Sequence, residues 1–263
     1  MHIIVCIKQV IDTSARIRIV DGKVDAQGSS RVVNPYDEFA LEEAIRIRES
    51  DPASGTQVTA ISLGPESFKD ALKTALAMGV DRAIHLEDPA FEGLDNLGVA
   101  HVLALVIKSL PYDLILCGRQ AVDDDMAQVG PSLAVLLGLP FATVVTGLKL
   151  SEDKNKAEIT RQIEGGNEVL ESALPLLVTC QKGLNIPRLP SLKGIMAAKK
   201  KPVEILTAQD LMFRTETMGI SRNRVEGIGL SLPPERKKGQ ILHGPLNESV
   251  ATLVSRLKED RVI

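Results

Sequence analysis

Short apolar runs alternate with longer segments of helical spacing over the first half of the chain. The apolar runs, which predict strands, cover residues 3–7, 57–62, 83–86 and 114–117. The segments between them, which predict helices, cover residues 37–48, 65–78 and 94–110. Alternation of this kind is typical of a doubly wound, mostly parallel sheet with helices on both faces. We therefore expect an α/β fold.

The pattern changes at residue 141. Residues 142–150, 157–164 and 169–180 read as strands that extend the sheet in antiparallel fashion, with Gly165-Gly166-Asn167 as a hairpin turn between the last two. After Cys180, prolines at positions 187, 190, 202, 233 and 234 interrupt the chain, and only residues 247–260 predict a strong helix. A tail of about 75 residues with so little regular structure cannot bury a core of its own. We expect it to pack on a partner.

The composition suits a fold of this class. Apolar residues make up 44% of the 263 residues but aromatic residues only 3%, so aliphatic side chains must fill the core. The net charge of −3 disfavours a nucleic-acid surface. No apolar run reaches the ~20 residues that span a bilayer, and the chain begins with a strand and not with a basic leader. These features predict a cytoplasmic protein without a membrane segment.

The cysteines and histidines do not form a recognisable reactive set. Cys6, Cys117 and Cys180 are widely spaced, each ends an apolar run, and no Cys-x-x-Cys occurs, so neither a disulfide framework nor a zinc site is indicated. The histidines are scattered and lack a partner at the spacing of a hydrolytic triad. We expect no catalytic residue and no metal site, and we expect buried cysteines whose small size leaves room for a ligand at the sheet edge.

The segment from Asp113 to Pro131 carries the strongest functional pattern. An apolar run ends at Cys117, Gly118 opens a polar loop, and a helical pattern starts near Met126. A loop between the carboxyl end of a buried strand and a helix N-terminus is where open α/β sheets bind nucleotides. Since Asp123 to Asp125 precede the helix, a phosphate there must be met by backbone N–H groups and by Arg119 or Gln128. The alternative is an ordinary strand-to-helix turn with acidic capping. A Gly-x-Gly-x-x-Gly fingerprint is missing after the first strand, which disfavours a standard Rossmann site.

This segment also resembles the adenine-nucleotide loop in the β subunits of electron transfer flavoproteins. Further blocks follow the order of that family and cover most of the chain: residues 5–12, 34–44, 74–81, 184–188 and 195–201. The resemblance implies a fold of the adenine nucleotide alpha-hydrolase-like (HUP) type. It also implies an obligate α subunit that holds most of the FAD site, and an electron carrier without catalytic residues of its own.

The resemblance implies a cofactor-binding set as well. Its members are Cys6, Asn34, Pro35, Tyr36, Asp37, Leu63, Gly118, Arg119, Gln120, Ala121, Val122, Asp123, Asp124, Asp125, Met126, Ala127, Gln128 and Val129. The amide of Asn34 is suited to reading an adenine edge, and the backbone N–H groups of residues 128–130 to binding phosphate.

A second site implied by the resemblance is a recognition loop within residues 184–201 that docks on flavin dehydrogenases. Leu192 occupies the position of its apolar anchor, beside Leu189, with Ile195 following. The alternative is that Leu192 packs internally and Lys199 to Lys201 form a solvated face. We accordingly divide the chain into a nucleotide-binding domain, residues 1–183, and a recognition loop with a C-terminal arm on the α subunit, residues 184–263.

Two occupants of the nucleotide pocket are possible, AMP and a second FAD. Electron-bifurcating relatives, which hold a second FAD and oxidise NADH, have glycine in the middle of the acidic triplet, where this chain has Asp124. Residues 127–131, however, resemble the bifurcating group. We expect AMP, because the Asp124 side chain crowds a position that glycine leaves open.

The sequence departs from the family pattern at two positions, and two other classes of protein share part of its pattern. Gln162 stands where many members have an acid, and Thr13 where some have a tyrosine near the flavin. A stand-alone nucleotide sensor of the universal-stress type shares the sheet pattern but would end near Cys180. An ATP-using ligase or sulfurtransferase of related fold would need a Ser/Gly-rich loop after the first strand, where residues 8–12 are not such a loop. The commonest partners in the family are acyl-CoA dehydrogenases.

Overall fold

The computed structural model describes residues 1–25, 27–213, 223–234 and 239–263. They form two units, each of which is described by itself. One comprises residues 1–17 and the described part of 25–228, and the other comprises residues 18–24 and the described part of 229–263.

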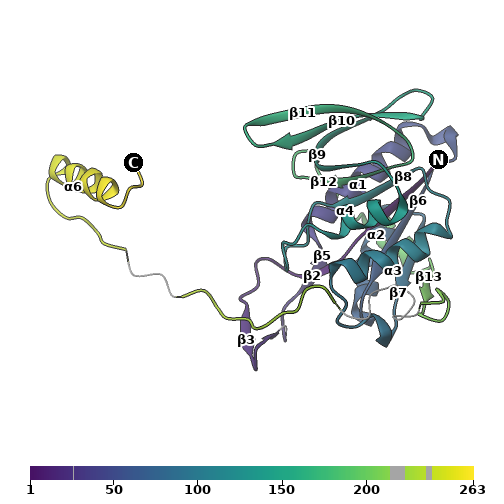
Figure 1. The fold of residues 1–263 in the computed structure, drawn as a ribbon, viewed down its shortest axis with the longest axis horizontal. Coiled ribbons are helices and arrows are strands. Elements are labelled where there is room, and N and C mark those ends of the chain that lie inside the picture. The colour runs from purple at the N-terminus through teal and green to yellow at the C-terminus, as the bar shows by residue number, and fades with distance from the viewer. Residues whose placement is uncertain (26, 214–222, 235–238) are drawn as a thin grey trace. The chain divides into compact units, whose positions relative to one another are not determined.

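The larger unit is built on a nine-stranded sheet (Figure 1). Its strands are β1 (His2–Cys6), β6 (Gln57–Leu63), β7 (Arg82–Leu86), β8 (Leu114–Gly118), β9 (Phe141–Leu150), β10 (Lys156–Ile163), β11 (Gly166–Ala173), β12 (Leu176–Cys180) and β13 (Val203–Leu206). Their spatial order is β11-β10-β9-β12-β8-β1-β6-β7-β13. Neighbours from β9 to β13 in this order are parallel, whereas β10 pairs antiparallel with both β9 and β11. The predicted doubly wound sheet is confirmed.

Helices cover both faces of this sheet. They are α1 (Pro35–Ser50), α2 (Lys69–Met78), α3 (Asn96–Lys108), α4 (Val129–Leu137) and α5 (Leu192–Ala198), with short 3₁₀ turns η1 (Pro52–Ser54), η2 (Glu66–Phe68) and η3 (Pro89–Phe91). A small ladder pairs β2 (Gln9–Ile11) with β5 (Arg31–Val33).

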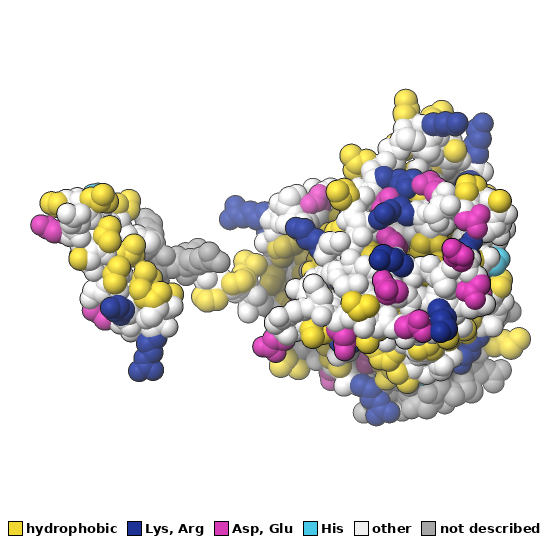
Figure 2. Space-filling view, turned by 90° about the horizontal axis from the view of Figure 1, so that it is seen from above, with side chains coloured by type: hydrophobic (Ala, Val, Ile, Leu, Met, Phe, Trp, Pro, Cys, Tyr) yellow, Lys and Arg dark blue, Asp and Glu magenta, His cyan; other side chains and the backbone are white. Residues whose placement is uncertain are grey.

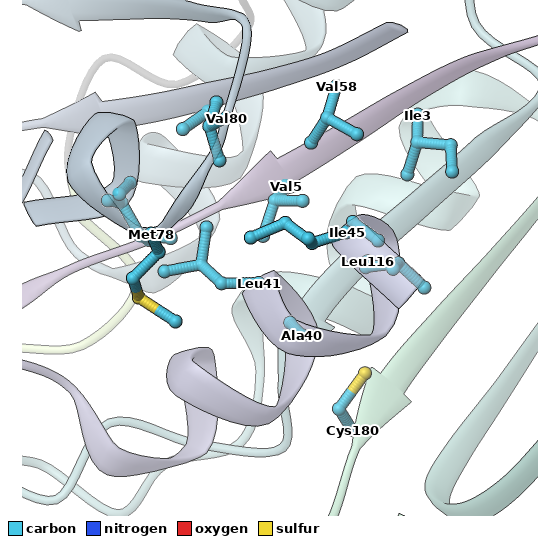
Figure 3. Close-up of a cluster of buried hydrophobic side chains, with 14 of the residues drawn as sticks. Ile3, Val5, Ala40, Leu41, Ile45, Val58, Met78, Val80, Leu116 and Cys180 are labelled. Atoms are coloured by element: carbon cyan, nitrogen blue, oxygen red, sulfur yellow. The ribbon is translucent and has the colours of Figure 1, made fainter. Parts of the chain in front are cut away.

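The strand period of two explains the two cores. Along β1, Ile3 and Val5 pack with α1 and α2, while Ile4 and Cys6 pack with α3 and α4. In Figure 3, Val5 and Val58 point from the strands toward Leu41 and Ile45 on α1. Because strands buried on both faces need apolar residues at every position, they read as continuous apolar runs in the sequence.

The order of the strands places a crevice beside β1. From β1 the chain passes through α1 to β6 and through α2 to β7, all on one side. It then returns through α3 to β8, which pairs with the other edge of β1. The strand order therefore reverses between β1 and β8, and open α/β sheets bind ligands at the carboxyl ends of the two strands that flank such a point.

One predicted strand is wrong. Residues 169–180 form no single strand but divide between β11 and β12, with the break at Leu174 and Pro175. A proline has no N–H to donate to a ladder, so it separates the strands. β11 completes the predicted antiparallel hairpin with β10, whereas β12 lies parallel between β8 and β9.

The chain after Cys180 has more structure than its pattern predicts. β13 pairs with β7 at the sheet edge, and α5 packs so closely on α2 that a Cβ at Gly194 would overlap the carbonyl oxygen of Ala77. The expectation that the tail after Cys180 has little regular structure besides residues 247–260 is thus wrong for α5 and β13. The division of the chain at residue 183 concerns the partner subunit and stays a prediction.

The smaller unit contains β3 (Arg18–Val20), the first two residues of its partner strand β4 (Lys23–Asp25) and the helix α6 (Leu246–Glu259). This helix confirms the one predicted for residues 247–260. No residue of α6 is buried, and Leu246, Val250, Leu253 and Val254 are exposed on it. Figure 2 shows hydrophobic side chains, in yellow, gathered on this segment. Among the described residues, no helix is long and apolar enough to cross a membrane.

Candidate functional site

A cavity opens at the crevice between β1 and β8. Its walls come from the strand ends, from the start of α1, from α3 and from the loop between β8 and α4. The lining residues are Cys6, Ile7, Lys8, Asn34, Asp37, Ile61, Leu63, Asn96, Val99, Leu103, Cys117, Gly118, Arg119, Gln120, Ala121, Asp124, Ala127, Gln128, Val129 and Gly130. The structure therefore brings together five segments that lie far apart in the sequence.

Most of the predicted cofactor set lies in this wall, but part of it does not. Pro35 and Tyr36 belong to the first turn of α1 without lining the cavity, and the same holds within the loop for Val122, Asp123, Asp125 and Met126. The remaining predicted residues line it. Whether they bind a cofactor stays a prediction.

Asn34 holds the loop in place. Its Nδ2 donates to the carbonyl oxygen of Gln120 at 2.8 Å, and its Oδ1 accepts from the N–H of Val122 at 3.1 Å. The side chain is buried, and it makes no capping hydrogen bond to α1. One N–H of the amide and one lone pair of its oxygen thus position the loop. The reading of an adenine edge by the same amide stays a prediction.

Gly118 is required by a close approach of α1 to the end of β8. The Gly118 N–H donates to Oδ1 of Asp37 at 3.0 Å. A Cβ at this position would overlap that oxygen and would lie 2.8 Å from the backbone nitrogen of Asp37. Only glycine allows this contact, so the strand end and the helix start are fixed against each other.

The loop from Arg119 to Gln128 is held by backbone hydrogen bonds, and its backbone is strained at two positions. The N–H of Arg119 donates to the carbonyl of Cys180, and that of Asp125 donates to Ala121 at 2.8 Å. Asp125 and Ala127 have φ of 52° and 53°, the left-handed region that side chains disfavour. Backbone strain of this kind persists only where the surrounding structure fixes the conformation, and it is concentrated at binding sites.

The N-terminus of α4 faces the cavity without a side-chain cap. Gln128 is the residue before the helix, and its side chain makes no capping hydrogen bond. Val129 and Gly130, which both line the cavity, are the first residues of the helix. Uncapped N–H groups at a helix N-terminus favour an anion.

Among the charged residues that line the cavity, Lys8 is the one that the sequence did not predict. Its Nζ lies 2.7 Å from Oδ1 of Asp123 and 3.4 Å from Oδ2 of Asp124. It therefore joins the end of β1 to the acidic part of the loop. Its place directly after the first apolar run was the available signal. Asn96, Val99 and Leu103 of α3 were missed as well, because nothing in their own segment marks them.

The pKa values of three buried ionisable groups in or beside the site are raised. Burial raises the pKa of Asp37 to about 7, against the opposing effect of the N–H groups of Lys8 and Gly118. A hydrogen bond with Cys6, together with burial, raises the pKa of the Cys117 thiol, and burial raises that of Cys180. Thiols with raised pKa values are poor nucleophiles. Within the described part of the chain, no cluster of His, Cys, Asp and Glu is suited to hold a metal ion.

The predicted docking residues lie on α5 and the segment before it. Leu189 is 89% exposed, Leu192 is 77% exposed and Ile195 is 41% exposed. Leu192 therefore does not pack internally. Ile186 and Met196 are exposed apolar residues of the same stretch of chain that were not predicted.

The fold and the cavity define a doubly wound α/β protein with a ligand crevice at its topological switch point. A family model described as the electron transfer flavoprotein domain matches residues 21–211. The chain belongs to this family. Membership makes it an electron-transfer protein associated with a flavin.

Curated relatives match along the whole chain. "Electron transfer flavoprotein subunit beta" of Thermoanaerobacterium thermosaccharolyticum is 43% identical over 100% of both chains. The protein of the same name from Bacillus subtilis is 41% identical over 99% of this chain and 98% of its own. "Caffeyl-CoA reductase-Etf complex subunit CarD" of Acetobacterium woodii is 40% identical over 100% of both. The similarity to beta subunits implies an alpha subunit as partner.

Proposed function

We propose that this chain is the beta subunit of a heterodimeric electron transfer flavoprotein that carries electrons from a flavin dehydrogenase to a downstream acceptor, with FAD held mostly by the alpha subunit. The observation that carries the proposal is the crevice between β1 and β8, walled by the loop of residues 118–130. The thiols of Cys6, Cys117 and Cys180 are free and buried, which suits a reducing, cytoplasmic compartment.

We infer that the beta crevice binds AMP. The uncapped start of α4 is suited to the phosphate, and Lys8 and Arg119 are the cations that line the cavity. The apolar wall formed by Ile61, Leu63 and Val99 is suited to a base. Asp124 lines the cavity, and its Oδ1 accepts from the N–H of Met126 at 3.0 Å, so its side chain takes up space there.

An electron-bifurcating protein with a second FAD in this crevice is the second candidate. Residues 127–131 favour it, as does the similarity to the Acetobacterium subunit, which is named as part of a reductase complex. The two candidates differ in cofactor content and in reactivity with NADH.

The alpha subunit is the partner that the exposed apolar residues of α6 fit best. Leu246, Val250, Leu253 and Val254 are exposed on one amphipathic helix, and such a helix gains stability by burying its apolar stripe. A docked flavin dehydrogenase, of the acyl-CoA dehydrogenase type in our proposal, would meet the different surface formed by Leu189, Leu192 and Ile195.

The test is the cofactor content of the co-expressed heterodimer, measured by acid extraction and chromatography. One FAD and one AMP per heterodimer are expected. Two FAD, together with flavin reduction by NADH, would establish the bifurcating candidate instead. The chain expressed alone is the control: a stable monomer that binds a nucleotide and needs no alpha subunit would contradict the heterodimer and support a stand-alone sensor.

A further inference from the structure

Asp37 closes the crevice at its base. It is the third residue of α1, and its carboxylate lies between the two strand ends that flank the switch point. Oδ2 accepts from the N–H of Lys8, which follows β1, at 2.7 Å. Oδ1 accepts from the N–H of Gly118, the last residue of β8, at 3.0 Å. One buried carboxylate therefore ties the two sides of the crevice together.

The two backbone N–H groups that Asp37 binds lie beside the carboxyl ends of β1 and β8. Donors at the carboxyl ends of strands beside a switch point are the groups that α/β proteins offer to ligand anions. Here an internal carboxylate occupies them. The anionic group of a bound ligand is therefore directed to the remaining backbone N–H donors, at the start of α4. The uncharged part of the ligand is directed to the strand ends.

The charged surroundings of Asp37 come from several elements. Lys8, after β1, is the cation that faces it, and Lys8 is itself bound to Asp123 and Asp124 of the loop. The thiols of Cys117 on β8 and Cys180 on β12 lie close enough to sense its charge. Arg119 lines the same cavity. The half-buried Glu38 follows it on α1.

We propose that Asp37 is a positioning residue of the nucleotide crevice: only its ionised carboxylate accepts both strand-end hydrogen bonds, so nucleotide affinity depends on its ionisation. This inference rests on the proposed nucleotide pocket. In a protonated carboxyl group, one oxygen carries the proton and is a weaker hydrogen-bond acceptor. One of the two N–H donors would then face this oxygen or its O–H group, so one of the two hydrogen bonds would weaken or break. The strand ends would then separate, and with them the walls formed by Lys8 and Gly118.

The pH range follows from burial. Because the pKa of Asp37 is raised to about 7, the fraction of ionised Asp37 falls as the pH falls through 7. Nucleotide affinity is therefore greatest above pH 7 and decreases below it, by at most about tenfold per pH unit for one proton. The phosphate of AMP titrates near pH 6, so adenosine, which lacks it, isolates the contribution of the protein.

The experiment measures the Kd of AMP and of adenosine by equilibrium dialysis, on the heterodimer freed of nucleotide, from about pH 6 to about pH 8. Asp37→Asn keeps the shape but has one acceptor oxygen for two N–H donors. We expect its Kd at pH 8 to rise by about tenfold or more, with little further dependence on pH. Glu38→Gln, its neighbour outside the cavity wall, is the matched control and should behave as the wild type.

The outcomes separate this inference from the proposed function. If neither the wild type nor the variants bind nucleotide, the proposed pocket is wrong. If the wild type binds adenosine with a flat pH profile, or Asp37→Asn binds as tightly as the wild type, the positioning role is wrong. Should Asp37→Asn not fold, the adenosine profile of the wild type alone decides.

Discussion

Arg188 donates from its Nε to Oε2 of the buried Glu42 at 2.8 Å, while its two terminal nitrogens bind Glu49 two turns further along α1 at 2.8 Å each. Asn185 adds hydrogen bonds to Glu43 and to the carbonyl of Phe39. The start of the predicted recognition loop is thus fixed to α1, the same helix that contributes Asp37 to the cavity. A surface loop that is fixed at its base loses little entropy on docking.

A double-mutant cycle checks the Arg188–Glu42 interaction. Arg188→Met leaves the buried Glu42 without its partner, and we expect the free energy of unfolding to fall by about 1–3 kcal/mol. Glu42→Gln should cost less, and the double variant should show a coupling energy above about 0.5 kcal/mol in chemical denaturation of the heterodimer. Lys149 and Glu158 form an exposed pair that serves as control, with an expected coupling near zero. Equal coupling in both pairs would contradict a special role for Arg188.

Gly118→Ala should disrupt the crevice. The added methyl group would overlap Oδ1 of Asp37, so α1 and β8 must separate. We expect AMP affinity to fall by about tenfold or more, with a loss of stability of about 1–3 kcal/mol. Gly166→Ala, where nothing lies within 4 Å of the added Cβ, is the matched control. Unchanged nucleotide content in Gly118→Ala would show that the close approach is not needed.

Leu192→Ala should weaken dehydrogenase docking without harming the heterodimer. Leu192 is exposed at the start of α5, and a docking anchor of this kind contributes about 2 kcal/mol, or ~30-fold in the rate of flavin reduction at a low concentration of partner. Val169→Ala, which removes an exposed apolar residue from β11, is the control and should leave the rate unchanged. Loss of FAD or dissociation of the subunits in Leu192→Ala would identify Leu192 as a packing residue.

His85 should make the fold sensitive to acid. It is fully buried, its Nε2 lies 2.9 Å from the carbonyl oxygen of Gly64, and burial lowers its pKa below 6.5. The unfolded chain then binds a proton that the native state does not, so the free energy of unfolding decreases as the pH falls below about 6.5, by up to about 1.4 kcal/mol per pH unit. Thermal unfolding of the wild type and of His85→Gln over this range measures the difference.

The wild type and His85→Gln must be compared at each pH because Asp37 changes the free energy of unfolding in the opposite direction to His85. Its raised pKa means that the native state binds the extra proton between about pH 4 and pH 7, so its contribution to stability grows as the pH falls. This contribution is common to the wild type and His85→Gln. An equal pH dependence in both would show that His85 does not carry the acid sensitivity.

The sequence alone determined the layered fold and the place of the cavity. Strands buried on both faces must be apolar at every position, and helices must show an apolar stripe, so both are visible as local periods. The strand, loop and helix around Gly118 could be predicted for the same reason. The existence of α1, predicted from residue 37 and observed from Pro35, and that of the helix α6 also follow from local signals.

Tertiary structure decided which residues meet. Asp37 bonds Lys8 across 29 positions and Gly118 across 81, and Asn34 bonds Gln120 across 86. No local period encodes such contacts, because they depend on strand order and on how closely α1 approaches β8. The same holds for the parallel insertion of β12 between β8 and β9 and for the packing of α5 on α2 at Gly194. Local patterns fix what each segment becomes, whereas packing between distant segments fixes which side chains form the cavity wall and which only hold it in place.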